Sequence, residues 1–159
     1  MLTLRQHKPG DIGWIICQHG EIYTNEFSFD PSFEIHIANK FVDFFGERNT
    51  SFDTVWVAEV NEERAGSIAV SRKSDKRAFV NFVLVLDKYR GRKIAYKLFE
   101  VAIQHCRDHQ FELLELETYS CLEGARKLYD KIGFNITEAD KGVTLFGQTL
   151  DREFWEMRL

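Results

Sequence analysis

The sequence predicts a single α/β domain in which helices cover a mixed β-sheet. Its 159 residues are the length of one ordinary domain, so we treat residues 1–159 as one unit. Segments with a two-residue repeat alternate along the chain with segments of helical repeat. The apolar run Ala78–Leu86 suits a central strand that is covered on both faces.

The N-terminal third predicts a strand followed by two helices. Leu2–Gln6 alternates between apolar and polar residues, as a half-buried strand does. A helix is expected over residues 12–23, with Asp11 as its candidate N-cap. A second helix begins near Pro31, because large apolar residues then recur every three or four positions.

The rest of the chain predicts six strands and two further helices. The expected strands are Thr54–Val60, Ala65–Ser71, Ala78–Leu86, Leu113–Thr118, Phe134–Ala139 and Leu150–Met157. Helices are expected over Arg92–His109 and Cys121–Ile132, and Gly133 suits the residue just after a helix. The order is βααβββαβαββ, which favours a mixed sheet flanked by about four helices.

Composition argues against several classes of function. The chain has 21 basic and 25 acidic residues, so a nucleic-acid partner is not expected. No apolar run approaches the roughly 18 residues of a membrane span, and the N-terminus does not resemble a secretory signal. Three cysteines without a CxxC pair fit neither a disulfide framework nor a zinc ribbon. We therefore expect a cytoplasmic protein with no membrane partner.

A short basic loop joins the apolar strand to the next helix. Gly91 allows a ligand to approach the backbone, and the helix start presents free N–H groups that bind phosphate. The loop and the first helical turn carry Lys88, Arg90, Arg92, Lys93 and Lys97. Such charge in an acidic protein suits a phosphorylated small molecule, while the alternative is a solvated surface turn.

Two motifs resemble signatures of the GNAT-superfamily N-acetyltransferases. Tyr89–Ala95 is similar to their Q/R-x-x-G-x-G/A pyrophosphate loop, and Ala125–Phe134 is similar to their A-x-x-L-Y-x-x-x-G-F signature. The spacing of the two motifs and the order of elements also match. The residues between Pro9 and Asp30, together with Gly147 and Gln148, resemble GNAT domains that are often fused to MarR-type regulators. This sequence has no such DNA-binding half, so we expect a standalone domain.

The resemblance implies the GNAT acyl-CoA N-acyltransferase fold, with a mixed, mostly antiparallel sheet that splays between its fourth and fifth strands. Acetyl-CoA would lie in that wedge as co-substrate, with no metal. Backbone amides of the fourth strand would pair with the pantetheine, and those of the loop would hold the pyrophosphate. The implied cofactor-binding residues are Val83, Leu84, Val85, Arg90, Gly91, Arg92, Lys93, Ile94, Ala95, Tyr96, Leu122 and Tyr129.

The implied reaction is direct attack of a primary amine on the thioester in a ternary complex. Tyr129 matches the family's proton donor, and a phenol of pKa about 10 is close enough to a thiol of about 8.5 to donate late in the reaction. The alternative role of Tyr129 is packing against the sheet. Lys93 replaces the usual central glycine of the loop, and Leu122 replaces a common asparagine. These departures keep open a non-catalytic acyl-CoA-binding sensor or regulatory module.

Glu117 is the first candidate for the general base. Alternation along Leu113–Thr118 sets it on the face opposite Leu114 and Leu116, near the end of the strand. Some GNAT members that acetylate protein N-termini have a catalytic Glu at the matching place, while the alternative is a solvated strand residue. Glu26, Phe27 and Phe29 are expected to line the acceptor pocket.

The acceptor is expected to be a small-molecule or peptide amine. Exposed edge strands in this fold often form dimers, so a homodimer stays open as well. His105 and His109 have the spacing of a helical metal site, but residue 106 is cysteine where HExxH chemistry would need glutamate. We therefore expect no metal.

Overall fold

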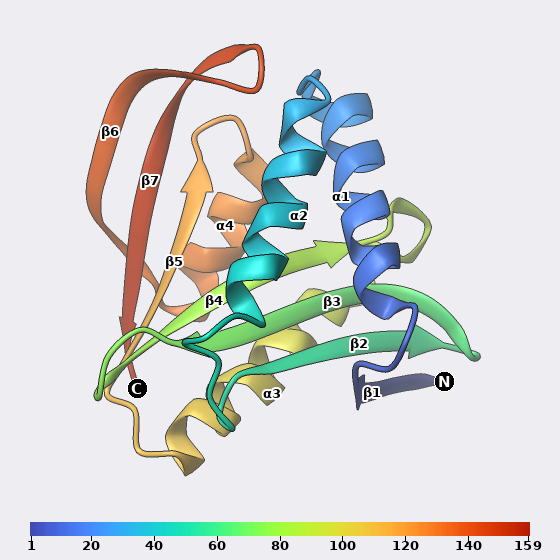
Figure 1. Ribbon diagram of the computed structural model, residues 1–159, viewed down its shortest axis with the longest axis vertical. Coiled ribbons are helices and arrows are strands. Elements are labelled where there is room, and N and C mark those ends of the chain that lie inside the picture. Colours follow the sequence, from blue (N-terminus) through green and yellow to red (C-terminus); the bar gives the residue numbers. More distant parts are fainter.

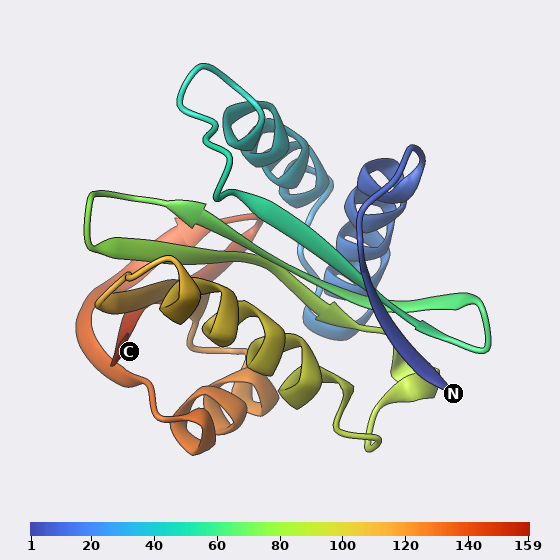
Figure 2. The ribbon, with the colours of Figure 1, turned by 90° about the horizontal axis from the view of Figure 1, so that it is seen from below.

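A computed structural model describes residues 1–159 as one seven-stranded sheet covered by helices on both faces (Figures 1 and 2). The strands lie in the order β1-β2-β3-β4-β5-β7-β6. Helices α1 and α2 cover one face, and α3 and α4 cover the other. The elements are β1 (Leu2–Gln6), α1 (Asp11–Phe27), α2 (Ser32–Phe44), β2 (Thr54–Val60), β3 (Glu63–Arg72), β4 (Arg77–Val85), the 3-10 turn Asp87–Tyr89, α3 (Ile94–Asp108), β5 (Leu113–Tyr119), α4 (Glu123–Ile132), β6 (Asn135–Leu145) and β7 (Gln148–Arg158).

The predicted order of strands and helices is confirmed, and so is the mixed, mostly antiparallel sheet. The largest differences lie near the two ends of the chain. Helix α1 continues about one turn beyond Tyr23, to Phe27, and the last two strands are longer than expected. The residues expected to form a loop between those strands instead extend the β6–β7 ladder, which turns at Phe146–Gly147.

The sheet separates two apolar cores. One core lies on the side of α3 and α4 and includes Leu98, Phe99, Leu114 and Phe134. The other lies under α1 and α2 and is dominated by aromatic rings, which hold the two helices against the sheet. Its stacked rings include Tyr23 on Phe33, with centroids 4.3 Å apart, and Phe41 on Phe82, at 3.6 Å.

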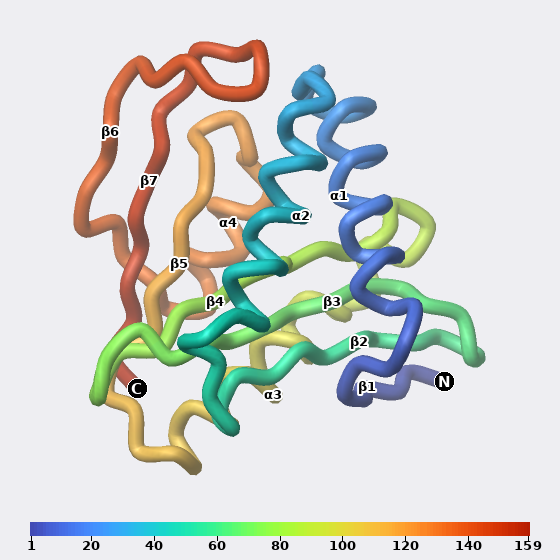
Figure 3. Tube along the Cα trace, in the orientation of Figure 1, coloured from blue at the N-terminus to red at the C-terminus, as the bar shows by residue number.

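β4 and β5 are the only parallel neighbours, and they pair over a short distance. Their register covers only Arg77–Phe79 against Leu113–Glu115, after which the strands separate into a wedge (Figure 3). A β-bulge interrupts β4 beside the wedge, where Phe82 takes a φ of 55°. The splay expected between the fourth and fifth strands is therefore confirmed.

The N–H groups of β4 show which part of its backbone faces the wedge. Leu86 donates to the carbonyl of Ala65 at 2.8 Å, so its N–H faces the strand β3. Successive N–H groups along a strand point to opposite edges. The N–H groups of Val83 and Val85 therefore face the wedge, while that of Leu84 faces β3.

Asp11 is not the N-cap that the sequence suggested. Gly10 precedes the helix with a φ of 96°, and Asp11 lies in the first turn with 0% of its surface exposed. Its carboxylate accepts hydrogen bonds from Arg5 Nη1 at 2.7 Å, Arg64 Nε at 2.8 Å and the Lys8 backbone N–H at 2.7 Å. One buried carboxylate thus joins β1 and β3 to the start of α1.

Burial by itself would raise the pKa of Asp11, but the hydrogen bonds from Arg5, Lys8 and Arg64 outweigh it and lower the pKa to about 2. Because the pKa of Asp11 is lower in the folded state, its ionised form stabilises the fold at pH values above the unfolded-state pKa of 3.8. This stabilisation is lost as the pH falls toward 2. The difference corresponds to about 2 kcal/mol at neutral pH.

We expect Asp11→Asn to lower the free energy of unfolding by about 2–4 kcal/mol at pH 7, because two arginines lose their buried partner. The gap to the unmutated protein should close between about pH 5 and pH 2, as Asp11 itself becomes protonated. Denaturant-induced unfolding of both proteins at a series of pH values across this range measures the difference in their free energies of unfolding. Asp75→Asn, which removes the exposed partner of Arg72, is the control and should cost less than about 1 kcal/mol. A gap for Asp11→Asn that is equally large at pH 3 and pH 7 contradicts the ion-pair account.

Candidate active site

Two cavities open along the wedge between β4 and β5. The first, which we call the loop-side cavity, has a volume of about 540 Å³. It lies between β4, the end of α1 and the start of α4. Val83, Leu84 and Val85 line it from the strand, and Arg90 and Ala95 line it from the loop and the start of α3. With Leu122, just before α4, and Tyr129 from α4, seven predicted cofactor-binding residues therefore meet in one space.

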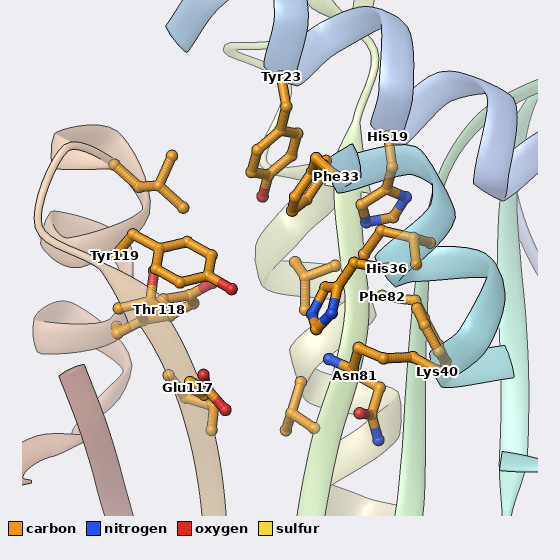
Figure 4. A pocket seen from close by; sticks show the side chains of 16 residues that line it. His19, Tyr23, Phe33, His36, Lys40, Asn81, Phe82, Glu117, Thr118 and Tyr119 are labelled. Carbon is orange, nitrogen blue, oxygen red and sulfur yellow. The ribbon is translucent and has the colours of Figure 1, made fainter. Parts of the chain in front are cut away.

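The second cavity, which we call the helix-side cavity, lies between α1, α2, β4 and β5 (Figure 4). Its volume is about 220 Å³. Aromatic side chains form much of its wall, and polar groups reach into it from each of the four elements. The polar residues are His19, Tyr23, His36, Lys40, Asn81, Glu117, Thr118, Tyr119 and Tyr129.

The two cavities meet at four residues that line both of them. These are Tyr23 from α1, Val83 from β4, and Leu122 and Tyr129 from the start and interior of α4. The two cavities are therefore next to each other at this junction. Tyr129 brings the only phenol of α4 to it.

Tyr129 is held firmly at the junction. Its ring packs edge-to-face against Phe99, Phe134 and Trp155, with centroids 5.8–6.1 Å apart. Burial raises the pKa of its hydroxyl, so the phenol stays protonated at neutral pH. Packing and proton donation, which the sequence presented as alternatives, are compatible in this position.

The basic loop has a strained backbone at the residue that replaces the family's usual glycine. Lys93 precedes α3 with a φ of 60°, in the left-handed region where a non-glycine residue costs about 1 kcal/mol or more. Gly91 also has a positive φ, of 78°, and a Cβ there would meet no atom within 4 Å. Ile94 is buried and anchors the helix start to the core. Neither cavity is lined by the remaining predicted loop residues, Gly91, Arg92, Lys93, Ile94 and Tyr96.

Arg90 and Glu26 form an ion pair over the loop-side cavity. Arg90 Nη1 donates to Glu26 Oε1 at 2.6 Å, and Nη2 donates to Oε2 at 2.8 Å. The hydrogen bonds from Arg90 hold the pKa of Glu26 below its usual value. This bidentate pair connects α1 to the basic loop.

The three predicted acceptor residues do not come together in the helix-side cavity. Glu26 and Phe27 line the loop-side cavity instead. Phe29 is 1% exposed and lies in the aromatic core against Tyr119 and Phe146, so it reaches neither cavity. The structure therefore gives no support for a contact between these three residues and an acceptor in the helix-side cavity.

Glu117 lines the helix-side cavity from β5, as the alternation of that strand suggested. Leu114 and Leu116 are buried on the opposite face. The carboxylate is solvent-accessible and its Oε1 lies 3.6 Å from Nε of Arg152. Glu117 thus faces the cavity at its rim with a cation beside it.

His19 and Lys40 are cavity residues that the sequence did not identify. His19 is buried, and its Nδ1 lies 2.8 Å from the Ile15 carbonyl, which fixes Nδ1 as the donor. Burial lowers the pKa of His19 to about 4, so the ring is neutral. Both residues lie in amphipathic helices, where their sequence neighbours predict only ordinary packing. Nothing in the nearby sequence distinguishes a cavity-lining residue from a packed or solvated one.

Other types of site find little support. No three histidine, cysteine or carboxylate side chains gather as metal ligands. His105 Nε2 lies 2.8 Å from the Phe52 carbonyl, and its ring stacks on Phe52. None of the helices has the length and apolar character needed to cross a bilayer.

Comparison with known proteins identifies the family. A model of the Acetyltransferase (GNAT) family matches residues 17–134. A Xenopus laevis protein named probable N-acetyltransferase camello is 31% identical over 88 residues, which cover 54% of this chain. The match covers only 39% of that protein, so this chain spans well under half of its length.

Solved structures show the same fold. A GNAT-family acetyltransferase from Staphylococcus aureus Mu50 superposes with a TM-score of 0.80 at 20% identity and covers 100% of this chain and 99% of its own. A GNAT-family acetyltransferase from Elizabethkingia anophelis, solved with acetyl-CoA bound, gives a TM-score of 0.73 at 19% identity, covering 99% and 98%. The splayed sheet, the two motifs and the family match agree: this chain belongs to the GNAT acetyltransferase family.

Proposed function

We propose that this chain transfers the acetyl group of acetyl-CoA to a primary amine by direct attack in a ternary complex. The observation that carries the proposal is the meeting of two cavities at Tyr129. Acetyl-CoA occupies the loop-side cavity, and the amine occupies the helix-side cavity. The thioester and the amine then meet at the junction, and no covalent enzyme intermediate is needed.

The loop-side cavity suits the pantetheine and pyrophosphate of acetyl-CoA. The free N–H groups of Val83 and Val85 offer strand-like hydrogen bonds to an extended amide chain. The N-terminus of α3 and the basic loop supply N–H groups and positive charge for phosphates. Arg90 is already paired with Glu26, so the backbone of Gly91–Tyr96 supplies most of the phosphate contacts.

The reaction forms an amide bond and breaks the carbon–sulfur bond of the thioester. The neutral amine attacks the carbonyl carbon, and the electron pair returns from the oxyanion as the thiolate leaves. The hydroxyl of Tyr129, which is protonated at neutral pH, gives a proton to the leaving sulfur. The nitrogen, which is positively charged after the attack, releases its surplus proton to solvent as the amide forms, and the phenolate takes up a proton from solvent.

The attacking ammonium must first lose a proton. Glu117 takes this proton, directly or through a water molecule, because it is the only carboxylate that lines the helix-side cavity. Arg152 Nε lies 3.6 Å from its Oε1 at the rim of the cavity. Glu26 is less suited to the role, since both of its oxygens accept hydrogen bonds from Arg90.

Acetyl-CoA should raise the melting temperature of the protein through mass action, by several degrees at concentrations far above its Kd. ATP and NAD should raise it much less, because they lack the pantetheine arm that pairs with β4. Thermal melts with each ligand measure this. Stabilisation by ATP equal to that by acetyl-CoA indicates a general phosphate site, and no shift with millimolar acetyl-CoA contradicts the proposal.

Tyr129→Phe should lower kcat by about 10- to 1,000-fold, because the leaving thiolate loses its proton donor. The ring and its packing remain, so the affinity for acetyl-CoA should change little. Release of free thiol from acetyl-CoA measures the rate, and thermal shift measures binding. An unchanged kcat together with a lower melting temperature assigns Tyr129 to structure only. Binding of acetyl-CoA with no turnover by the unmutated protein favours a sensor module instead.

Glu117→Gln should lower kcat/KM most at neutral pH and recover part of it at high pH, where the amine deprotonates by itself. The pH profile of kcat/KM measures this effect. Glu115→Gln is the matched control, since Glu115 lies on the same strand and binds Lys73 and Arg77 outside the cavity. Its profile should follow that of the unmutated enzyme. A loss for Glu117→Gln that is the same at every pH removes Glu117 from the role of base.

A further inference from the structure

The helix-side cavity contains a lysine that has no ion-pair partner. Lys40 extends from α2 into the cavity, and Figure 4 shows its side chain entering below His36. Its Nζ lies 5.4 Å from the centroid of the Phe82 ring and makes no ion pair within 4 Å. Burial lowers the pKa of Lys40, although the charge of Glu117 acts in the opposite direction. A half-buried cation of this kind needs a partner to offset its lost hydration.

None of the charged groups around Lys40 forms an ion pair with it. Glu117 faces Lys40 from β5, but Arg152 lies 3.6 Å from that carboxylate and also binds Asp140 at 2.9 Å. His19 is neutral, as its lowered pKa requires. The pKa of His36 is lowered by burial and further by the charges of Lys40 and Arg152. Lys40 is therefore left without an ion-pair partner, and a bound anionic group would be attracted to its ammonium.

Lys40 lies away from the place where acetyl transfer occurs. Asn81 is two residues beyond Phe79, the last residue of β4 that pairs with β5, so it marks the narrow end of the wedge. Figure 4 shows Lys40 beside Asn81 at this end and Tyr23, which belongs to the junction, at the other. An acceptor that reaches both ends of the helix-side cavity thus places one functional group at the junction and a second, different group at Lys40.

The size of the cavity limits the acceptor. Its volume of about 220 Å³ is smaller than the roughly 300–1,000 Å³ of sites for drug-sized ligands. A small molecule fits such a space, whereas a polyamine or an extended peptide would have to project out of it.

We propose that the acceptor is a small amine that carries a carboxylate, as an amino acid does, and that Lys40 binds the carboxylate while the amine faces Tyr129. The inference rests on the proposed acetyl transfer and names the substrate class of the same site. A single carboxylate accepts hydrogen bonds from the ammonium of Lys40, which fixes the orientation of the amine toward the thioester.

Matched pairs of amines test the proposal. Each pair consists of an amino acid and the amine that differs from it only by loss of the carboxylate, such as valine with isobutylamine and methionine with 3-(methylthio)propylamine. Thiol release from acetyl-CoA gives kcat/KM for both members. The unmutated enzyme should prefer the amino acid, and Lys40→Met should lower the ratio within each pair by about 10- to 100-fold, mostly through KM. The two amines of a pair differ in basicity, but this difference cancels in the comparison between enzyme and variant.

Lys40→Arg keeps the charge and should keep most of the preference. Lys76→Met is the control, because Lys76 is an exposed lysine in the turn between β3 and β4. Melting temperatures establish that each variant is folded, and Lys40→Gln replaces Lys40→Met if the latter does not fold.

Three outcomes contradict the proposal. If the ratio of kcat/KM between amino acid and matched amine is the same in Lys40→Met (or Lys40→Gln) as in the unmutated enzyme, Lys40 does not bind the carboxylate. A preference of the unmutated enzyme for the amines without carboxylate overturns the substrate class but leaves acetyl transfer standing. No turnover of any amine, with acetyl-CoA bound, rejects the proposed function and this inference together.

Discussion

The separation of β4 from β5 is the constraint on which the rest of the structure depends. Two parallel strands that stop pairing inside a domain leave backbone N–H and C=O groups without partners, and each such buried group costs about 1–3 kcal/mol. The bulge at Phe82 strengthens the divergence. The wedge is therefore a place where a ligand with amide groups gains hydrogen bonds that the protein itself does not supply.

The helices on the two faces of the sheet determine what the wedge can do. The buried Asp11 ion pairs fix the start of α1, and the Arg90–Glu26 pair fixes its end against the basic loop. On the other side, α4 places Tyr129 against a rigid aromatic core. Because α1 and α4 reach the wedge at the same point, the phenol of Tyr129 lines both cavities, as the proposed direct transfer needs.

The sequence predicted those features that depend on local patterns. The strand and helix order and the alternation at Glu117 follow from a few neighbouring residues each. Features that depend on long-range packing were missed or misplaced. Asp11 looked like an N-cap because its arginine partners are distant in sequence, and Phe29 looked like a pocket residue although β6–β7 covers it. Lys40 was not singled out, because its surroundings come from three separate elements.

Hydrogen exchange of individual backbone amides, with and without saturating acetyl-CoA, tests the central claim most directly. If acetyl-CoA fills the loop-side cavity and pairs with β4, the amides of Val83 and Val85 and those of Gly91–Tyr96 become strongly protected, while Leu84, whose N–H faces β3, changes little. Unchanged exchange at Val83 and Val85, with protection confined to other parts of the sheet, would contradict the account.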